Sequence, residues 1–403
     1  MKLIAGSLCL FLGINLIFQA ACEARFAVKQ TRQVPINRLL KNLEYQRADA
    51  MNSTDKAMVD FQIGRLHSMA YAQQVELAAC DSAAIPGSKY ELPDFGHTPD
   101  HIQFALKDKY KKNAAADVHL KLAIQNLQAA IKTDPGLMPA KLGLAWCLEQ
   151  SGNKASAKTL YKEVFASTYK DERDSKGGMY NWSISLEAAK YLKPLLDPQK
   201  DKKELDDLDK CSAEIQKLPR YITPILVPLT KENNLKALLV SKKVRFDLDG
   251  FGAANYGQWV SNKAAWLVFD TERNGKIDSG LKLVGQSSFW LFWRNGYDVL
   301  RSLDDNHDGK LSGAELRTMA LWQDKNANGI SDAGELKALE EYKIRALKFN
   351  DSRDKNGTLC CKQGVLYTDG SSAASWDVML RKIPDRPNKA KQILPAGLIP
   401  ISP

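Results

Sequence analysis

Apolar residues recur every three or four positions through the first half of the chain, which is the spacing of one face of an α-helix. The segment from Asp55 to Ala79 carries a clear pattern of this kind. A stretch rich in Pro and Gly between Cys80 and Pro99 interrupts it, and the helical spacing then resumes as far as Leu196. We therefore predict a mainly α-helical N-terminal half, with one helical region at 25–97 and a second at 98–198.

The pattern changes after Asp197-Pro198. The charged stretch from Lys200 to Lys217 predicts a solvated helix within a linker at 199–240. Alternating apolar and polar residues then indicate β-strands at Val244–Leu248, Gly364–Tyr367 and Ser375–Leu380, and Asp369-Gly370 predicts a hairpin turn between the last two. The fold class expected is α+β with several domains, in which a module at 241–382 precedes a Pro-rich tail at 383–403.

The N-terminus has the pattern of a secretory signal peptide over residues 1–24. Lys2 supplies a positive charge, Leu3 to Phe18 is apolar, and small residues follow at Ala20 and Ala21. We expect an exported protein that is periplasmic, held at the cell surface or secreted. Cys22 leaves lipid attachment, and so association with the envelope, as an alternative. A transmembrane anchor is a second alternative, although the apolar run is short for one.

Composition narrows the class of protein. In 403 residues, 44% hydrophobic and 26% charged residues are typical of a folded globular chain. The net charge of +10 is spread along the sequence without a recognition motif, so nucleic acid is not an expected partner. The cysteines after the signal peptide allow one or two disulfides but do not form a disulfide framework; they are Cys80, Cys147, Cys211, Cys360 and Cys361.

Small and large apolar residues in the second helical region fall at the positions that let two antiparallel helices approach closely. They are Ala123, Leu127 and Ala130 before Pro135, and then Leu144, Ala145, Gly152, Ala157, Tyr161 and Val164. This spacing resembles tetratricopeptide repeats over about two repeats, and Trp182 to Leu196 could form a third. The alternative is a generic helical hairpin bundle. The resemblance implies that the repeats bind a protein or peptide partner.

Asp304 to Glu315 fits the template of an EF-hand calcium loop. Such loops supply oxygen ligands at positions 1, 3, 5, 7, 9 and 12, with Gly at position 6 for a sharp turn. Gly309 stands at position 6. The predicted ligands are the side chains of Asp304, Asn306 and Asp308, the Lys310 carbonyl, Ser312 directly or through water, and a bidentate Glu315.

A second copy of the template runs from Asp324 to Glu335, with Gly329 at position 6. Its predicted ligands are Asp324, Asn326, Asn328, the Ile330 carbonyl, Asp332 and Glu335. The alternative is that these residues only form surface turns. Because the loops follow closely, we expect one short helix from Glu315 to Trp322 between them, and hence a static calcium ion rather than a large calcium-driven opening.

Two further acidic clusters depart from the template. The cluster from Asp270 to Asp278 has Leu281 and Lys282 where the closing carboxylate would stand, and a lysine ammonium there would repel a cation. In the second cluster, Asp247 and Asp249 run into Phe251 instead of further ligands. We expect the second cluster to turn the chain, and whether the first binds an ion is left open.

Val244 to Lys382 resembles the EF-hand-type calcium module of exported bacterial proteins, often found beside repeats-in-toxin segments. The matching motifs are FDLDG at Phe246 to Gly250, VFD and NGKIDSG within Val268 to Gly280, the two loops, and DGSS with WDV near the end. The resemblance covers about a third of the chain and implies calcium binding and export. It implies no substrate.

Catalytic motifs of common hydrolases are absent from the sequence: it contains no GxSxG, HExxH or phosphate-binding loop. His97 and His101 have the spacing of metal ligands, but Pro99 between them favours a helix start. The aromatic run from Phe289 to Trp293 could bind a sugar or form part of the core, and the core is the more common role. We expect an exported calcium-binding protein that acts as a protein-interaction or scaffold module. The alternative is a secreted hydrolase with a calcium-stabilised C-terminal module.

Overall fold

The computed structural model describes residues 33–383, apart from 51, 74–76, 80–113, 176–178, 181–182, 219, 231, 233, 249–252, 271–274 and 292. Several sequence predictions lie outside the described residues. They are the signal peptide at 1–24, Cys22, Cys80, the helix start with His97 and His101, and the tail from 384 onward. In the part of the chain that is described, no helix is long and apolar enough to cross a membrane.

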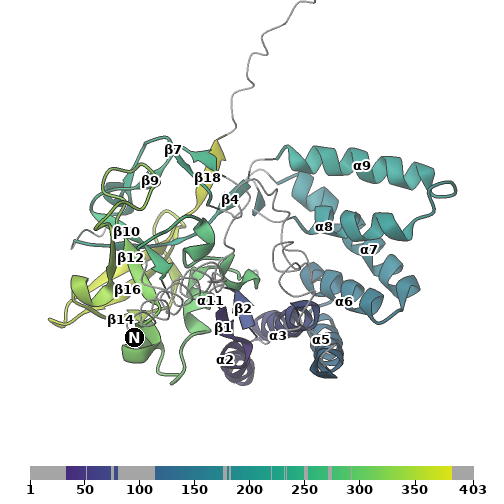
Figure 1. The fold of residues 1–403 in the computed structure, drawn as a ribbon, viewed down its shortest axis with the longest axis horizontal. Helices are drawn as coiled ribbons and strands as arrows, with labels where there is room; N and C mark the ends of the chain where they lie inside the picture. The colour runs from purple at the N-terminus through teal and green to yellow at the C-terminus, as the bar shows by residue number, and fades with distance from the viewer. Residues whose placement is uncertain are drawn as a thin grey trace, which may run out of the picture.

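The first half of the described chain is helical, as the apolar spacing predicted (Figure 1). The helices are α2 (Ile36–Asp49), α3 (Ser53–Gln73), α5 (Ala114–Thr133), α6 (Met138–Gln150), α7 (Lys154–Arg173), α8 (Ile184–Leu192), the 3₁₀ turn η1 (Lys193–Leu195) and α9 (Lys202–Gln216). Helices α5 to α9 pack around one core. The alanines predicted to face partner helices are fully buried in it: Ala123, Ala130, Ala145 and Ala157. Gly152, which was predicted with them, is exposed in the turn between α6 and α7.

The second half is a curled antiparallel sheet with smaller sheets beside it (Figure 1). The main sheet has the order β11-β14-β16-β17-β5-β10-β12-β13, and β15 pairs with β16. Its strands are β5 (Ile225–Pro228), β10 (Ala264–Phe269), β11 (Lys310–Ser312), β12 (Met319–Trp322), β13 (Leu336–Ala338), β14 (Ile344–Lys348), β15 (Ser352–Arg353), β16 (Leu359–Tyr367) and β17 (Ser372–Asp377). The predicted hairpin at Asp369-Gly370 is confirmed as β16–β17.

Smaller elements complete the architecture. A five-stranded sheet has the order β3-β4-β18-β8-β7, and two-stranded ribbons join β1 to β2 and β6 to β9. These strands are β1 (Gln33–Pro35), β2 (Leu77–Ala79), β3 (Met179–Tyr180), β4 (Arg220–Ile222), β6 (Leu239–Val240), β7 (Val244–Phe246), β8 (Ala254–Tyr256), β9 (Trp259–Val260) and β18 (Leu380–Ile383). The short helices are α10 (Leu235–Leu238), α11 (Gly296–Arg301), η2 (Gly280–Lys282), η3 (Ser288–Trp290), η4 (Gly313–Leu316) and η5 (Leu339–Tyr342).

The predicted helix from Glu315 to Trp322 is wrong. Only η4 extends into this segment, and Met319–Trp322 forms β12, which pairs with β10 on one side and β13 on the other. Leu321 faces one core and Trp322 the core on the opposite face of the sheet. A strand sends successive side chains to opposite faces, so a run of consecutive apolar residues can be buried on both faces of a central sheet.

Helices α2 and α3 cover one face of the main sheet. Leu39 of α2 and Ile63 of α3 share a core with sheet residues such as Leu267, while Phe61 of α3 faces the core of the helical repeats. Helix α3 approaches α5 so closely that a Cβ on Gly64 would lie 2.7 Å from Leu127 Cγ. The N-terminal helices are therefore packed on the C-terminal sheet and on the repeats at once.

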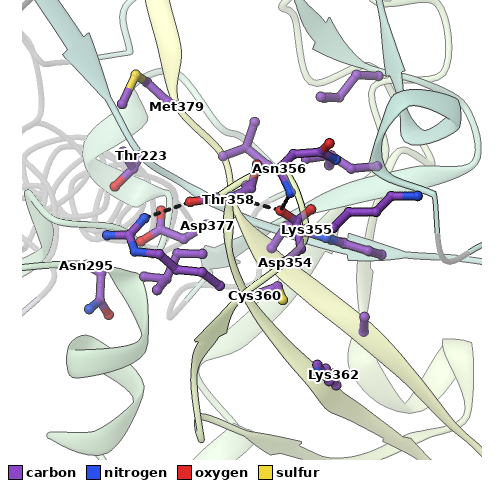
Figure 2. A pocket seen from close by; sticks show the side chains of 18 of the residues that line it. Thr223, Asn295, Asp354, Lys355, Asn356, Thr358, Cys360, Lys362, Asp377 and Met379 are labelled. Carbon is purple, nitrogen blue, oxygen red and sulfur yellow. Dashed lines mark hydrogen bonds between the residues drawn. The ribbon is translucent and has the colours of Figure 1, made fainter. Parts of the chain in front are cut away.

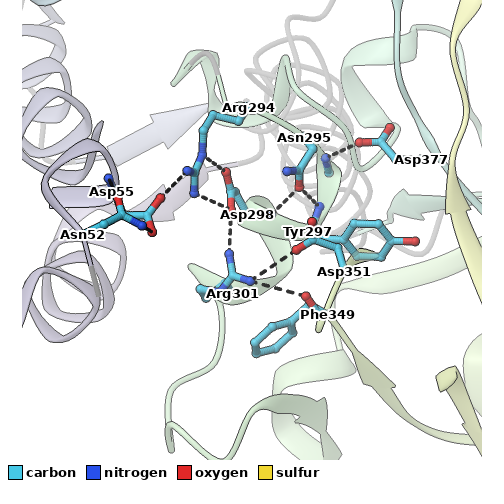
Figure 3. A network of polar contacts seen from close by, with 11 residues as sticks. Asn52, Asp55, Arg294, Asn295, Tyr297, Asp298, Arg301, Phe349, Asp351 and Asp377 are labelled. Carbon is cyan, nitrogen blue, oxygen red and sulfur yellow. Dashed lines mark hydrogen bonds and ion pairs between the residues drawn. The ribbon is translucent and has the colours of Figure 1, made fainter. Parts of the chain in front are cut away.

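An ionic network fastens α3 to the sheet region (Figure 3). The Arg294 guanidinium contacts Asp55 at the start of α3 at 2.5 Å and Asp298 in α11 at 2.9 Å. Arg301 contacts the same Asp298 carboxylate at 2.6 Å and Asp351 at 3.6 Å. Asp298 is buried, so its two arginine partners offset the cost of removing its charge from water.

The segment at 199–240, expected to be a linker, is folded into α9, β4, β5, α10 and β6. Helix α9 buries Leu208 in the core of the repeats, and β5 pairs with β10 and β17 in the middle of the main sheet. The thiols of all four described cysteines are free; these are Cys147, Cys211, Cys360 and Cys361.

Candidate metal centre

The two predicted loops occupy different places in the sheet region. Asp304–Glu315 follows α11 and contains strand β11, and it ends within η4. Asp324–Glu335 connects β12 to β13, which are neighbours in the main sheet. Both loops are therefore anchored at each end by elements of the packed C-terminal region.

The first residue of each loop holds the turn at position 6. In the first loop Asp304 Oδ2 accepts from Gly309 N at 3.0 Å, and Oδ1 accepts from Asp308 N at 3.3 Å. In the second, Asp324 Oδ2 accepts from Gly329 N at 2.7 Å. Asp324 Oδ1 accepts from Asn328 N at 3.0 Å. The two loops thus share one hydrogen-bond pattern.

The closing glutamates bond in the same way in both loops. Glu315 Oε1 accepts from Asp305 N at 2.8 Å, and its Oε2 accepts from Ser312 N at 2.9 Å. Glu335 Oε1 accepts from Lys325 N at 2.8 Å, and its Oε2 accepts from Asp332 N at 3.0 Å. Each glutamate therefore ties the end of its loop to the beginning, with both carboxylate oxygens directed at the loop backbone.

The glycines at position 6 are required by the backbone. Gly309 has φ +80° and Gly329 has φ +75°, which is the left-handed region that disfavours side chains. Gly329 is also packed tightly, because a Cβ there would lie 2.7 Å from the Arg245 carbonyl oxygen. Nothing lies within 4 Å of the corresponding position at Gly309.

The loops differ in the polar contacts of their middle residues. In the first, the Lys310 ammonium contacts the Asp308 carboxylate at 2.5 Å and lowers the pKa of that carboxyl group. In the second, the amide groups of Asn326 and Asn328 both donate to Asp332 Oδ2, at 2.9 and 3.0 Å. Three predicted ligand side chains of the second loop therefore converge on one another.

Asp324 is fully buried, and sequence reasoning missed its partner. Trp259 Nε1 donates to Asp324 Oδ2 at 2.8 Å from strand β9. Burial raises the pKa of Asp324, and the hydrogen bonds from the loop amides and Trp259 oppose this shift. A contact across 65 residues has no signal in local spacing.

Helix α2 contacts the first loop, which sequence reasoning also missed. Arg38 Nε bonds to both oxygens of Asp305, at 2.9 and 3.0 Å, and Asn42 Nδ2 donates to Asp305 Oδ1 at 2.9 Å. The ring of Tyr45 stacks on the imidazole of His307. Asp305 and His307 stand at loop positions 2 and 4, which are not predicted ligand positions, so α2 holds the loop without taking up its ligand residues.

The donor set is the test of fit for a metal ion. All predicted ligands offer oxygen, which suits a hard cation such as calcium. Their carboxylates bond to loop amides, and each such oxygen has a second lone pair. Among the described residues, no group of three or more His, Cys, Asp or Glu side chains is arranged as a metal cluster. Besides three carboxylates, each predicted set includes Asn side chains and a backbone carbonyl, which do not belong to such a group: Asn306 and the Lys310 carbonyl in the first loop, and Asn326, Asn328 and the Ile330 carbonyl in the second.

The degenerate cluster near Asp270 has a lysine at its centre. The Lys282 ammonium is buried and contacts the Lys276 carbonyl at 3.0 Å and the Asp278 carboxylate at 2.7 Å. These two groups stand at positions 7 and 9 of the loop template. A side-chain ammonium thus contacts the oxygens that a bound cation would need.

The aromatic run proposed as a sugar or partner site belongs to the core where it is described. Phe289 and Trp293 are almost fully buried in the core beneath α2 and α3. Two members were predicted with them: Phe292 lies outside the described residues, and the side chain of Trp290 is not described either.

Comparison with known proteins gives two family matches. Residues 115–174 match the tetratricopeptide repeat family, and residues 230–381 match the SPM domain family. The tetratricopeptide-like prediction for the helical half is therefore supported. Over the C-terminal region the matching family is the SPM domain, where the sequence had suggested an EF-hand-type module.

A curated relative is the iron-regulated protein FrpA of Neisseria meningitidis serogroup C, which is 34% identical over 145 residues. The alignment covers 34% of this chain and 13% of the relative. The chain therefore spans only a small part of the length of that relative.

Proposed function

We propose that the protein is a calcium-binding interaction protein in which Asp304–Glu315 and Asp324–Glu335 each hold one structural calcium ion. The observation that carries this proposal is the shared hydrogen-bond pattern. In both loops the carboxylate of the first Asp accepts a hydrogen bond from the Gly amide at position 6. The carboxylate of the last Glu accepts from the amides of positions 2 and 9. Surface turns that arise independently have no reason to repeat this pattern.

The ion would act by stabilising the sheet region. The second loop joins two hydrogen-bonded strands, and no pair of long helices flanks either loop among the described residues. Calcium sensors open by moving a pair of helices that flank the loop, so we do not expect such an opening here. Each loop offers three carboxylates, which suits binding at about 10⁻⁵ to 10⁻³ M, the range of extracellular calcium modules and weaker sensors.

The helical repeats would supply the partner site. The tetratricopeptide match at 115–174 supports a role in protein–protein interaction, since such repeats present extended surfaces to peptides. Export to the periplasm, the cell surface or the medium belongs to the same proposal, and calcium at the required concentration is available there.

Calcium-dependent thermal stability tests the proposal. The purified protein should melt at a higher temperature in millimolar calcium than in chelator, because a ligand that binds only the folded state stabilises it. Asp304→Ala and Asp324→Ala together should abolish the shift. Asp206→Ala removes an exposed carboxylate from α9 and is the matched control, which should keep the full shift. A shift that survives the double substitution would contradict the assignment of the ion to these loops.

A further inference from the structure

A large cleft lies in the C-terminal half, and none of the predicted ligand residues of either loop lines it. Its volume is about 1360 Å³, and it lies between the turn that joins β15 to β16, helix α10 and the end of β17. In Figure 2 the turn residues Asp354, Lys355 and Asn356 lie on the right, and Thr223 and Asn295 lie on the left. The volume exceeds the ~300–1,000 Å³ of ordinary small-molecule pockets, so the cleft can take an extended ligand.

The lining of the cleft carries unpaired positive charge. Four basic side chains in it have no carboxylate partner within the described residues, namely Lys236, Arg353, Lys355 and Lys362. Arg353 donates one Nη1 bond, to the Gly357 carbonyl at 2.7 Å, and its other donors remain available. All four side chains are exposed, so a bound anion could reach them.

Neither of the two acidic side chains that line the cleft forms an ion pair with these cations within the described residues. Asp354 Oδ1 accepts from the amides of Asn356 and Thr358, at 2.8 and 2.9 Å, and so serves the turn. Asp377 is buried at the floor, where Oδ2 accepts from Gly296 N at 2.8 Å and Oδ1 has no hydrogen-bond partner among the described residues. Burial raises the pKa of Asp377 to about 7, so this carboxyl group carries only part of a negative charge at neutral pH.

The floor also has apolar character that suits a peptide. Leu235, Leu239 and Leu359 line it and are only partly buried. The side chain of Trp376 is only 3% exposed, so it offers no open ring face for stacking on a sugar or a base. Strand β15 pairs on one side only, with β16, and its two residues are exposed, so an extended peptide backbone could add to it.

We propose that this cleft binds an extended acidic peptide segment of a partner protein. The four unpaired cations would contact its carboxylates, and the partly buried leucines would take apolar side chains between them. This binding surface is separate from the helical repeats and does not depend on calcium in the loops. The protein would then have two peptide-binding faces, one on each half of the chain.

Fluorescence anisotropy with a labelled peptide of alternating Glu and Leu tests the proposal on the full chain. The matched control peptide replaces every Glu with Gln. We expect saturable binding of the Glu peptide that weakens with salt, and affinity for the Gln peptide at least about tenfold lower.

Charge reversal locates the binding. Lys355→Glu with Lys362→Glu should weaken the Glu peptide at least about tenfold. Lys202→Glu with Lys210→Glu reverses two exposed lysines on α9, outside both the tetratricopeptide match and the cleft lining, and should leave the affinity within about twofold. All four positions are exposed, so both proteins should fold, which circular dichroism checks. Equal affinity for the two peptides, or equal loss in the two double variants, would overturn the proposal. Tighter binding of heparin or of a single-stranded oligonucleotide, lost in the cleft variant, would overturn its assignment to a peptide.

Discussion

The ring of Tyr45 lies flat on the imidazole of His307, with ring centroids 3.6 Å apart and planes 3° from parallel. Tyr45 belongs to helix α2, and His307 stands at position 4 of the first loop with φ +59°. A positive φ is unfavourable for a residue other than glycine. The stacking contact therefore helps to hold His307, and with it the loop, in this backbone conformation. Helix α2 and the first loop are therefore mechanically linked.

This link predicts that α2 contributes to calcium affinity. Arg38→Ala with Tyr45→Ala removes the two Arg38 bonds to Asp305 and the stack on His307, but no predicted ligand. We expect calcium affinity at the first loop to fall by about threefold to thirtyfold, the range of an ordinary coupling between neighbouring elements.

Calorimetry in the Asp324→Ala background isolates the first loop for this measurement. Glu44→Ala, an exposed position on the same helix, is the control and should leave the affinity unchanged. Unchanged affinity in the α2 double variant would show that the loop is held by its own bonds alone.

The buried Asp377 predicts an unusual pH dependence. Its pKa is raised from 3.8 to about 7 by burial, so the folded state holds a proton that the unfolded state releases. Its contribution to stability is full below about pH 4 and is lost as pH rises through about 7. As pH rises from ~5 to ~8, the free energy of unfolding of the wild type should fall by about 3 kcal/mol relative to that of Asp377→Asn, which cannot ionise.

Urea unfolding of the two proteins in chelator measures this difference. The asparagine retains an oxygen acceptor for Gly296 N, so the comparison isolates the charge. Parallel pH profiles for the two proteins would mean that Asp377 is ionised in the folded state throughout this range.

The histidine pair between α3 and α5 predicts the opposite trend. His67 Nδ1 lies 2.9 Å from His119 Nδ1, and burial together with the charge of His119 lowers the pKa of His67 to about 4. The unfolded state binds a proton near pH 6.5, so stability from this group is present above that pH and is lost as pH falls toward 4.

As pH falls from ~7 to ~5, the free energy of unfolding of the wild type should decrease by up to about 2 kcal/mol relative to that of His67→Asn. Thermal melts followed by helical circular dichroism measure this. Equal acid sensitivity in both proteins would show that His67 is protonated in the fold at little cost.

The two position-6 glycines give a matched test of loop packing. In Gly309→Ala the new Cβ has no neighbouring atom within 4 Å. The only penalty is the left-handed backbone conformation, which should lower the free energy of unfolding by about 1 kcal/mol. Gly329→Ala has the same backbone problem and also a clash with the Arg245 carbonyl, so we expect a loss of about 2 to 4 kcal/mol. Chemical denaturation in chelator compares them, and equal losses would contradict the close packing of the second loop on β7.

Local patterns in the sequence predicted local structure well. Helical spacing predicted α3 and the repeats, and Asp369-Gly370 predicted the β16–β17 hairpin, because each depends on neighbouring residues. The strand at Met319–Trp322 was missed, since four consecutive apolar residues fit a helix or a doubly buried strand equally well. Only the pairing with β10 and β13 decides between them.

Long-range contacts were beyond local reasoning for the same physical cause. Loop spacing led to twelve predicted ligand positions, which stay a prediction, whereas the contacts of Arg38 with Asp305 and of Trp259 with Asp324 join residues 267 and 65 positions apart. The cleft is likewise assembled from separate segments around Lys236, Asn295 and Lys355. Such sites form only once the sheet brings distant strands together.

Isothermal titration of the metal-free protein with calcium tests the central claim most directly. We predict uptake of two ions per chain, with dissociation constants of about 10⁻⁵ to 10⁻³ M. Glu315→Gln and Glu335→Gln should each remove one ion, and together both. A folded protein that takes up no calcium at millimolar concentration, or one whose uptake is unchanged in the double variant, would contradict the account.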